Sequence, residues 1–208
     1  MRLDDAPIDG PELFPDAWEK LDGFAQRLWD EGEERGLIGP RELPRLWSRH
    51  ILNCTAINEF IPQRAVTLDV GSGAGLPGIV LAMTRPDVHV HLVEAMERRV
   101  DWLREMAEAF ELPNVVIHSK RAEELHGDFQ AQVVTARAVA ALKKLVPLTM
   151  PLLKPGGTLV ALKGARAEIE IDEAVKTYRK NRVATVDLHQ ITPKGTDEST
   201  NIVIVTKR

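Results

Sequence analysis

Apolar positions in the first 61 residues recur with a helical period. Leu21, Phe24 and Leu28 are spaced three or four positions apart among charged residues, which predicts a helix over residues 12–36. A second stretch with the same period predicts a helix over residues 41–61, ended by a proline. Three of the four tryptophans lie in this region. We therefore expect an N-terminal helical extension, residues 1–61, with a small apolar core of its own.

Beyond residue 61, short apolar runs alternate with helical stretches. Such alternation predicts a mostly parallel sheet covered by helices on both faces, a Rossmann-like α/β domain over residues 62–208. The last two predicted strands have no helix between them, which predicts an antiparallel arrangement at one edge. The predicted strands are 66–70, 88–93, 115–118, 132–135, 158–162, 183–191 and 201–205, and the predicted helices are 76–84, 96–112, one ending near 153, and 167–180.

Composition narrows the class of protein. With 208 residues, 44% of them hydrophobic, the chain is long and apolar enough for a globular domain. No stretch approaches the roughly 20 apolar residues of a membrane-spanning helix, and the acidic N-terminus does not resemble a signal peptide. Cys54 is the single cysteine, which excludes an intrachain disulfide and a cysteine-based zinc site. We expect a cytoplasmic protein without a metal site or a membrane partner.

The net charge of −4 is unevenly distributed along the chain. Residues 1–36 hold 11 Asp/Glu and 4 Lys/Arg, whereas residues 37–208 hold 20 Asp/Glu and 23 Lys/Arg. The main body is therefore mildly basic, and a polyanionic partner remains possible despite the acidic total. Solvation of both parts would explain the same distribution.

A glycine-rich loop follows the first predicted strand. It reads Gly71-Ser72-Gly73-Ala74-Gly75-Leu76-Pro77-Gly78. Residues 73–78 match the dinucleotide pattern GxGxxG, but the first glycine after the strand is Gly71. Counted from there the pattern is GxGxG, with Leu76 where a dinucleotide site needs a third glycine. Asp69 lies two residues before Gly71, and an acidic strand end followed by GxGxG resembles the first motif of class I S-adenosylmethionine-dependent methyltransferases.

Further candidate residues follow the next strands. Glu94 ends the second predicted strand, 23 residues beyond Gly71, where an acidic side chain accepts hydrogen bonds from ribose hydroxyls. Glu123, or the backbone near it, follows the third strand and is placed to meet an adenine ring. Arg137 follows the fourth strand. In an open α/β sheet these positions border one crevice above the carboxyl ends of the strands.

The same residues limit the chemistry of methyl transfer. The segment after the fourth strand lacks the Asn-Pro-Pro-Tyr-like motif of amino-directed enzymes. Methylation at C5 of a pyrimidine needs a nucleophilic cysteine, and Cys54 lies far upstream of the sheet. What remains is a nucleophile that already has a free lone pair, such as guanine N7. That reaction needs alignment and no catalytic general base.

Several segments resemble the RsmG (GidB) family of bacterial methyltransferases. They are LDVGSGAGLPGIVLA, SKRAEEL, TARAVAAL, ALKG and, upstream, LWSRHILNC, and together they span roughly residues 43–206. The GLPG segment after GxGxG separates this family from most other class I methyltransferases. The resemblance implies a monomeric enzyme that uses S-adenosylmethionine to make 7-methylguanosine in 16S ribosomal RNA near the decoding site, acting on the RNA or on the small ribosomal subunit.

The resemblance also implies roles for particular residues. Together with the loop and strand ends, the expected cofactor-binding residues are Asp69, Gly71, Gly73, Gly75, Leu76, Glu94, Ala122, Glu123 and Arg137. The expected RNA-binding residues are Arg49, Arg121, Arg137 and Lys163. Lys163 equally fits a lysine extending from a strand terminus. His50 matches the upstream family motif, and its sequence context favours a histidine packed within a helical segment.

One segment departs from the family pattern, and three other functions stay open. Many members have an arginine before the last strand, where this chain has Ser199-Thr200-Asn201.

The alternatives are a class I methyltransferase with a protein or small-molecule substrate, a non-catalytic RNA-binding assembly factor, and a dinucleotide oxidoreductase. The GxGxG loop and Glu94 count against a non-catalytic factor. Leu76 and Asp69 count against a dinucleotide oxidoreductase.

Overall fold

The computed structural model describes residues 6–208, and its N-terminal part is helical but interrupted. Helix α1 spans Gly10–Leu13 and α2 spans Trp18–Glu31, so the helix predicted over residues 12–36 is in fact two shorter ones. Pro15 lies between them and has no backbone N–H to donate to a preceding turn. Gly36, with φ +64°, takes a turn conformation beyond the end of α2. Asp4 and Asp5 of the acidic segment lie outside the described residues.

The second predicted helix is also wrong as a single element. Its four parts are a 3₁₀ turn (Leu43–Arg45), a π-helical stretch (Leu46–Ile51), α3 (Leu52–Thr55) and a second 3₁₀ turn (Asn58–Phe60). Leu46, Trp47 and Ile51 are nevertheless fully buried. The apolar period therefore predicted which side chains enter the core but not the change of helical pitch between them.

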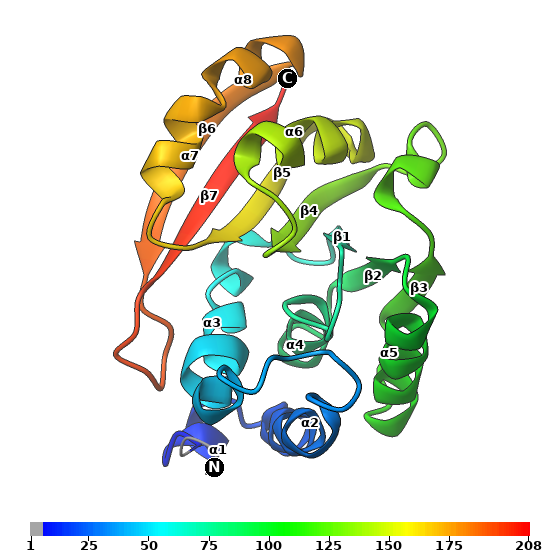
Figure 1. The fold of residues 1–208 in the computed structure, drawn as a ribbon, viewed down its shortest axis with the longest axis vertical. Coiled ribbons are helices and arrows are strands. Elements are labelled where there is room, and N and C mark those ends of the chain that lie inside the picture. Colours follow the sequence, from blue (N-terminus) through cyan, green and yellow to red (C-terminus); the bar gives the residue numbers. More distant parts are fainter. Residues whose placement is uncertain (1–5) are drawn as a thin grey trace.

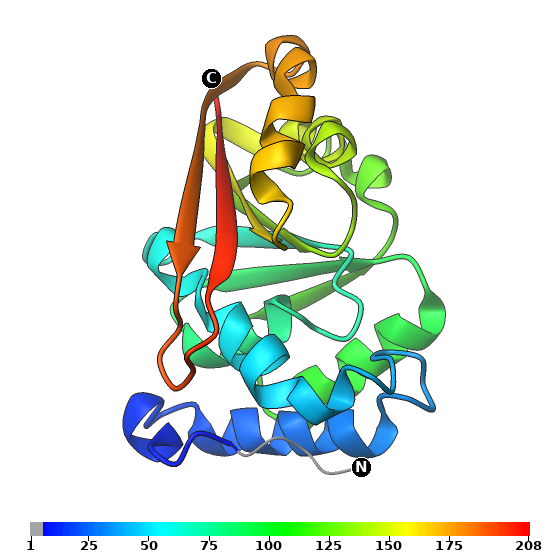
Figure 2. The same cartoon turned by 60° about the vertical axis from the view of Figure 1, so that its left-hand side comes forward.

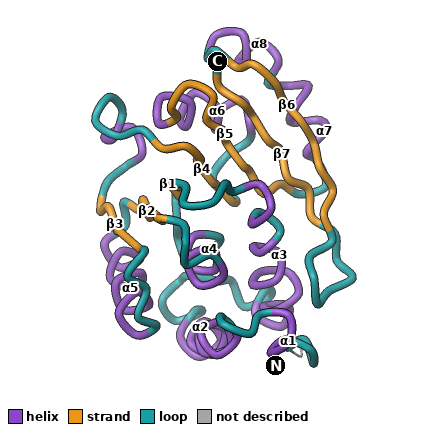
Figure 3. Tube along the Cα trace, turned by 180° about the vertical axis from the view of Figure 1, so that it is seen from behind, coloured by secondary structure: helices purple, strands orange, loops and turns teal. Residues whose placement is uncertain are grey.

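The remaining chain forms one seven-stranded sheet (Figures 1 and 3). Its strands are β1 (Val66–Val70), β2 (His89–Glu94), β3 (Val115–Ser119), β4 (Ala131–Arg137), β5 (Leu153–Lys163), β6 (Val183–Ile191) and β7 (Thr200–Lys207). The strand order is β3-β2-β1-β4-β5-β7-β6, and β7 is antiparallel to both of its neighbours. The predicted class I methyltransferase fold, with its antiparallel last strand, is confirmed.

Most strands lie within two residues of their predicted bounds, and two differences matter. β5 begins at Leu153, five residues early, because the Pro-Gly-Gly segment is accommodated as an irregularity in its pairing with β4. β4 extends through Arg137, which therefore belongs to the strand and does not follow it. The predicted helix over residues 167–180 is divided at Ala174 into α7 (Ala167–Glu173) and α8 (Val175–Lys180).

Two apolar cores cover the two faces of the sheet. One face holds α6 (Leu142–Thr149), α7 and α8, and the other holds α4 (Gly78–Thr84) and α5 (Glu97–Ala109). Figures 1 and 2 place α2 and α3 beside α4 and α5, and buried residues of all four belong to one continuous core. The N-terminal helices are thereby fixed against the sheet. Within residues 6–208, no helix has the length and apolar character needed to cross a membrane.

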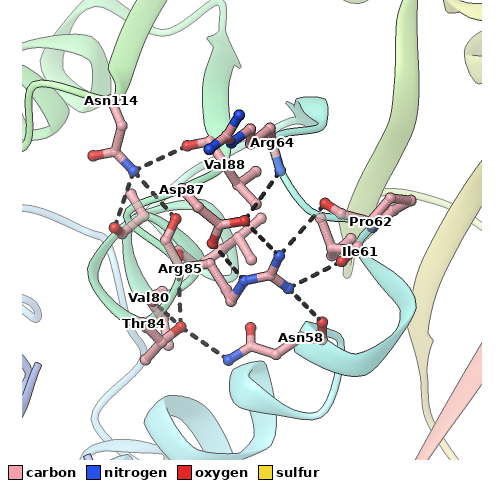
Figure 4. Close-up of polar contacts among 12 residues, drawn as sticks. Asn58, Ile61, Pro62, Arg64, Val80, Thr84, Arg85, Asp87, Val88 and Asn114 are labelled. Atoms are coloured by element: carbon pink, nitrogen blue, oxygen red, sulfur yellow. Dashed lines mark hydrogen bonds and ion pairs between the residues drawn. The ribbon is translucent and has the colours of Figure 1, made fainter. Parts of the chain in front are cut away.

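Arg85 joins the N-terminal segment to the turn between α4 and β2 (Figure 4). It follows the last residue of α4, whereas the glycine loop leads into the first. Its Nη1 donates to the carbonyl oxygens of Asn58 and Ile61, at 2.9 Å each. Its Nε and Nη2 donate to the two carboxylate oxygens of Asp87 at 2.7 and 2.9 Å. This carboxylate holds the guanidinium in place, and the guanidinium donates to carbonyl groups at and after the second 3₁₀ turn.

Replacement of this arginine is expected to destabilise the fold without touching the glycine loop. Arg85→Met keeps the apolar stem but removes the guanidinium that donates to two carbonyls and to Asp87, so the unfolding free energy should fall by about 2–3 kcal/mol. Denaturant titration measures this loss. Arg104→Met, which breaks an exposed pair with Asp101 on α5, is the control and should change it by less than about 0.5 kcal/mol. Equal effects of both substitutions would contradict a joining role for Arg85.

Candidate functional site

Two adjoining cavities open at the carboxyl ends of the central strands. The first, here called the loop cavity, has a volume of about 530 Å³ and borders the glycine loop and Glu94. The second, the outer cavity, has about 860 Å³ and borders the ends of β5 and β7. Both volumes are typical of small-molecule sites. The residues that line both cavities, and so form their junction, are Glu42, His50, Arg137, Ala138 and Val139.

The glycine loop exposes its backbone to the loop cavity. Gly71 and Gly73 have φ values of +68° and +54°, in the left-handed region that favours glycine. A Cβ atom on Gly73 would meet only the carbonyl oxygen of Gly71, at 3.7 Å, so this backbone faces open space. Gly75 has a different role, because its Cβ would lie 2.6 Å from Ile79 of α4. Gly71, Gly73 and Leu76 line the cavity, while Gly75 allows close packing of the helix.

Asp69 supports the loop from below. Its side chain is 1% exposed, and Oδ2 accepts a hydrogen bond from the backbone N–H of Gly78 at 3.1 Å. Oδ1 accepts one from the Thr135 hydroxyl at 3.1 Å. Burial raises the pKa of the Asp69 carboxyl to about 6. The structure thus places Asp69 beneath the residues that line the loop cavity, where it fixes the start of α4.

Glu94 forms a polar wall of the loop cavity. Its Oε2 accepts from the N–H of Gly73 at 3.0 Å, and its Oε1 accepts from the N–H groups of Ala95 and Met96 at 2.9 Å each. Arg99 adds a longer ion pair at 3.9 Å. This buried carboxylate is held in one orientation and retains acceptor capacity toward the cavity, because a carboxylate has about four lone-pair sites.

Arg137 lies at the junction of the cavities and contacts the N-terminal segment. Its Nη2 donates to Nδ1 of His50, and its Nη1 lies 3.2 Å from the sulfur of Cys54. His50 Nε2 lies 3.1 Å from a carboxylate oxygen of Glu42. Burial, and after it the charge of Arg137, lowers the pKa of His50 to about 4, so the imidazole is neutral at pH 7. His50 is buried, as its sequence context favoured, but it also lines both cavities.

Sequence reasoning missed this contact between the two segments. His50 and Arg137 are 87 residues apart, and no local pattern connects them. The signal available was the match of Arg49 and His50 to the upstream family segment, at the point where the chain faces the sheet. Cys54, interpreted from sequence as a buried apolar residue, is buried and also contacts the Arg137 guanidinium.

The other expected RNA-binding residues occupy different environments. Lys163 borders the outer cavity, but its side chain is only 9% exposed and its Nζ donates to the Ala140 carbonyl at 2.6 Å and to Glu170 at 2.8 Å. Arg49 borders the same cavity and forms an ion pair with Glu42 at 3.1 Å. Arg121, exposed after β3, lies outside the residues that line either cavity.

Ala122 and Glu123 also lie outside the lining of both cavities. They belong to a 3₁₀ turn, Ala122–Leu125, that follows β3, with Ala122 buried and Glu123 exposed. Ser199, Thr200 and Asn201, which replace the family arginine, do line the outer cavity. In the part of the chain that the structure describes, no group of three or more His, Cys, Asp or Glu side chains is arranged to hold a metal ion.

Solved structures share this fold at low sequence identity. A methyltransferase from Pyrococcus furiosus matches with a TM-score of 0.59 and 16% identity, over 89% of this chain and 98% of that one. M. jannaschii TYW2, solved in complex with AdoMet, matches with a TM-score of 0.53 and 19% identity, over 73% of this chain and 74% of that one. These similarities show the fold.

Closer relatives show the family. Ribosomal RNA small subunit methyltransferase G of Beutenbergia cavernae is 52% identical over 89% of this chain and 87% of its own length. The protein of the same name from Thermobifida fusca is 47% identical over 94% of this chain and 82% of its own length. The family described as GidB, rRNA small subunit methyltransferase G, matches residues 17–200, which include most of the N-terminal segment and strands β1 to β6. Since the match takes in the glycine loop and the segment that covers it, the chain belongs to the GidB family of rRNA small subunit methyltransferases.

Proposed function

We propose that this protein transfers a methyl group from S-adenosylmethionine to N7 of a guanine in 16S ribosomal RNA, near the decoding site. Membership of the GidB family supports the class of reaction and of substrate. The observation that carries the proposal is the meeting of two cavities at Arg137, one beside the glycine loop and a larger one beside the ends of β5 and β7. The target nucleotide follows from the sequence resemblance.

The loop cavity fits the cofactor. A Cβ on Gly73 would point into open space, so an approaching ligand meets bare backbone there. The buried Glu94 carboxylate, which keeps acceptor capacity toward the cavity, suits the hydroxyl donors of a ribose. Under this proposal, Gly71, Gly73, Leu76 and Glu94 contact the cofactor, and Arg137 contacts it from the junction. Asp69 and Gly75 act through the loop.

The chemistry requires little from the side chains beyond alignment. Bound S-adenosylmethionine would supply a methyl group on a positively charged sulfur. Guanine N7 attacks through its own lone pair, so no residue has to remove a proton. The chain then has to bring the base to the junction and exclude water there. Ala138 and Val139 line both cavities at this point, and Val139 supplies an apolar surface that is 37% exposed.

The outer cavity is the proposed RNA side of the site. Arg49 and Arg137 border it, and the ammonium group of Lys163 is directed inward to Glu170. Lys163 therefore acts, in this proposal, by holding α7 beside the cavity. Arg121 would contact RNA that extends beyond β3. We propose further that the enzyme acts as a monomer in the cytoplasm, and that the helical extension before residue 62 closes the cavities through Glu42 and His50.

The absence of a general base predicts a flat pH profile. With both ligands saturating, the single-turnover rate of methyl transfer should stay constant from about pH 6 to 9. Below about pH 6, Asp69 takes up a proton because burial raises its pKa to about 6, and its hold on Gly78 weakens. The apparent cofactor affinity should then fall toward lower pH. A bell-shaped single-turnover profile between pH 6 and 9 would contradict the proposal.

Mass spectrometry of ribosomal RNA tests the function directly. We expect 7-methylguanosine in 16S RNA from cells with the gene, its loss on deletion, and its return with the wild-type gene but not with Gly71→Val. Gly127→Val is a matched control, because Gly127 also has a positive φ, +88°, but lies outside both cavities. If deletion leaves the RNA unchanged and methyl groups appear on protein or small molecules, the protein is a class I methyltransferase with such a substrate. Restoration by Gly71→Val would favour a non-catalytic factor.

A further inference from the structure

The Arg137 guanidinium is held by neutral groups. Its partners are the Nδ1 atom of His50, the Cys54 sulfur, and the backbone carbonyls of Arg49 and His50, both at 3.4 Å. Among residues 6–208, no carboxylate lies within ion-pair distance of it. The positive charge at the junction is therefore fixed in position without being cancelled. Such a group attracts an anionic ligand, a carboxylate or a phosphate, more strongly than an arginine already paired with an acid.

The contacts of His50 determine which of its ring nitrogens carries the proton. An arginine side chain only donates hydrogen bonds, so Nδ1 of His50 accepts from it and has no proton. The neutral ring then carries its proton on Nε2, which faces Glu42 Oε2 at 3.1 Å. The same carboxylate oxygen of Glu42 forms an ion pair with Nε of Arg49 at 3.1 Å. A continuous chain, Arg49–Glu42–His50–Arg137, thus crosses the junction of the cavities.

We propose that His50 and Glu42 are positioning residues for Arg137. His50 presents an uncharged acceptor that orients the guanidinium between the cavities and leaves its charge for the ligands. Glu42 accepts the Nε2 proton of His50 and thereby fixes the orientation of the ring. The inference rests on the proposed function, because it assigns the retained charge to groups of the cofactor and of the RNA. The N-terminal segment thereby forms part of the site, because it supplies both positioning residues.

A double-mutant cycle tests whether His50 acts through Arg137. His50→Leu should lower kcat for RNA methylation roughly tenfold, because the guanidinium loses its acceptor. His50→Asn retains an acceptor near the Nδ1 position and should recover most of this activity. In an Arg137→Ala background, His50→Leu should add less than about a twofold loss. His91→Asn is the control, since His91 is also a neutral, partly buried histidine but lines neither cavity. Independent, multiplying losses would overturn the proposal.

A spectroscopic measurement tests the tautomer without any RNA. In the wild-type protein, ¹⁵N NMR of the imidazole assigned by comparison with His50→Asn should show a proton on Nε2 only, at pH 7. Glu42→Gln and Glu42→Leu should both keep the proton on Nε2, because Arg137 still donates to Nδ1 in each variant. Glu42→Leu, which loses the acceptor of that proton, should lower the affinity for S-adenosylhomocysteine, whereas Glu42→Gln should not. Affinity for S-adenosylhomocysteine should fall with His50→Leu and recover with His50→Asn. A proton on Nδ1, or on both nitrogens, at pH 7 would overturn the proposal. Neither the NMR spectrum nor the affinity for S-adenosylhomocysteine depends on RNA methylation. Both measurements therefore remain decisive even if the proposed substrate is wrong.

Discussion

Gly71→Val is expected to abolish binding of S-adenosylmethionine, with an affinity loss of roughly hundredfold or more. A Cβ at this position would lie 2.9 Å from Cγ2 of Val139, at the junction of the two cavities. The backbone also has φ +68°, a conformation that β-branched residues rarely adopt. The side chain therefore narrows the loop cavity and strains the backbone that borders it. Isothermal titration with S-adenosylmethionine and with S-adenosylhomocysteine measures the loss.

The control for this substitution separates backbone strain from steric blocking. Gly127→Val imposes the same left-handed strain, at φ +88°, with nothing within 4 Å of the added Cβ. It should reduce stability by a similar amount and leave cofactor affinity within about twofold. Both variants should retain the sheet, as judged by circular dichroism. Normal cofactor affinity in Gly71→Val, or tight NAD binding by the wild-type protein, would contradict the assignment of the loop cavity.

Local patterns predicted the sheet more accurately than the N-terminal segment. β1 lies at its predicted bounds because Val66, Leu68 and Val70 alternate with two polar residues just before a glycine turn, and this period of two marks a strand. The segment over residues 41–61 kept its apolar period but changed pitch three times. Its side chains fit a surface made by α2 and α4, and that surface is not encoded within the segment itself.

The sequence predicted the parts of the site that lie directly at the ends of strands. Gly71, Gly73 and Glu94 lie at strand ends, and strand ends of a parallel sheet meet at one edge. The direction of a side chain was not predictable in the same way. Lys163 borders a cavity at the end of β5, yet its ammonium group is bound by Glu170 on α7. The contact of Arg137 with His50 depends on how the N-terminal segment lies against the sheet, which only the assembled fold shows.

Arg137→Ala is expected to impair use of both ligands together. Arg137 lines both cavities, and its charge is not cancelled by a carboxylate among the described residues. We expect cofactor affinity to fall roughly tenfold and methyl transfer to RNA more than about a hundredfold. If Arg137 binds one phosphate, the slope of log affinity for RNA against log salt should decrease by about 0.7–0.9. Titration calorimetry and RNA binding at several salt concentrations measure the two effects.

Arg137→Lys distinguishes charge from geometry. Lysine keeps the positive charge, so the salt dependence of RNA binding should be preserved. A single ammonium group cannot match the fork that reaches His50, Cys54 and two backbone carbonyls at once, so methyl transfer should remain at least about tenfold reduced. Arg104→Ala, an exposed arginine on α5 away from both cavities, should leave binding and rate unchanged. Wild-type methylation by Arg137→Ala would show that the junction does not depend on this residue.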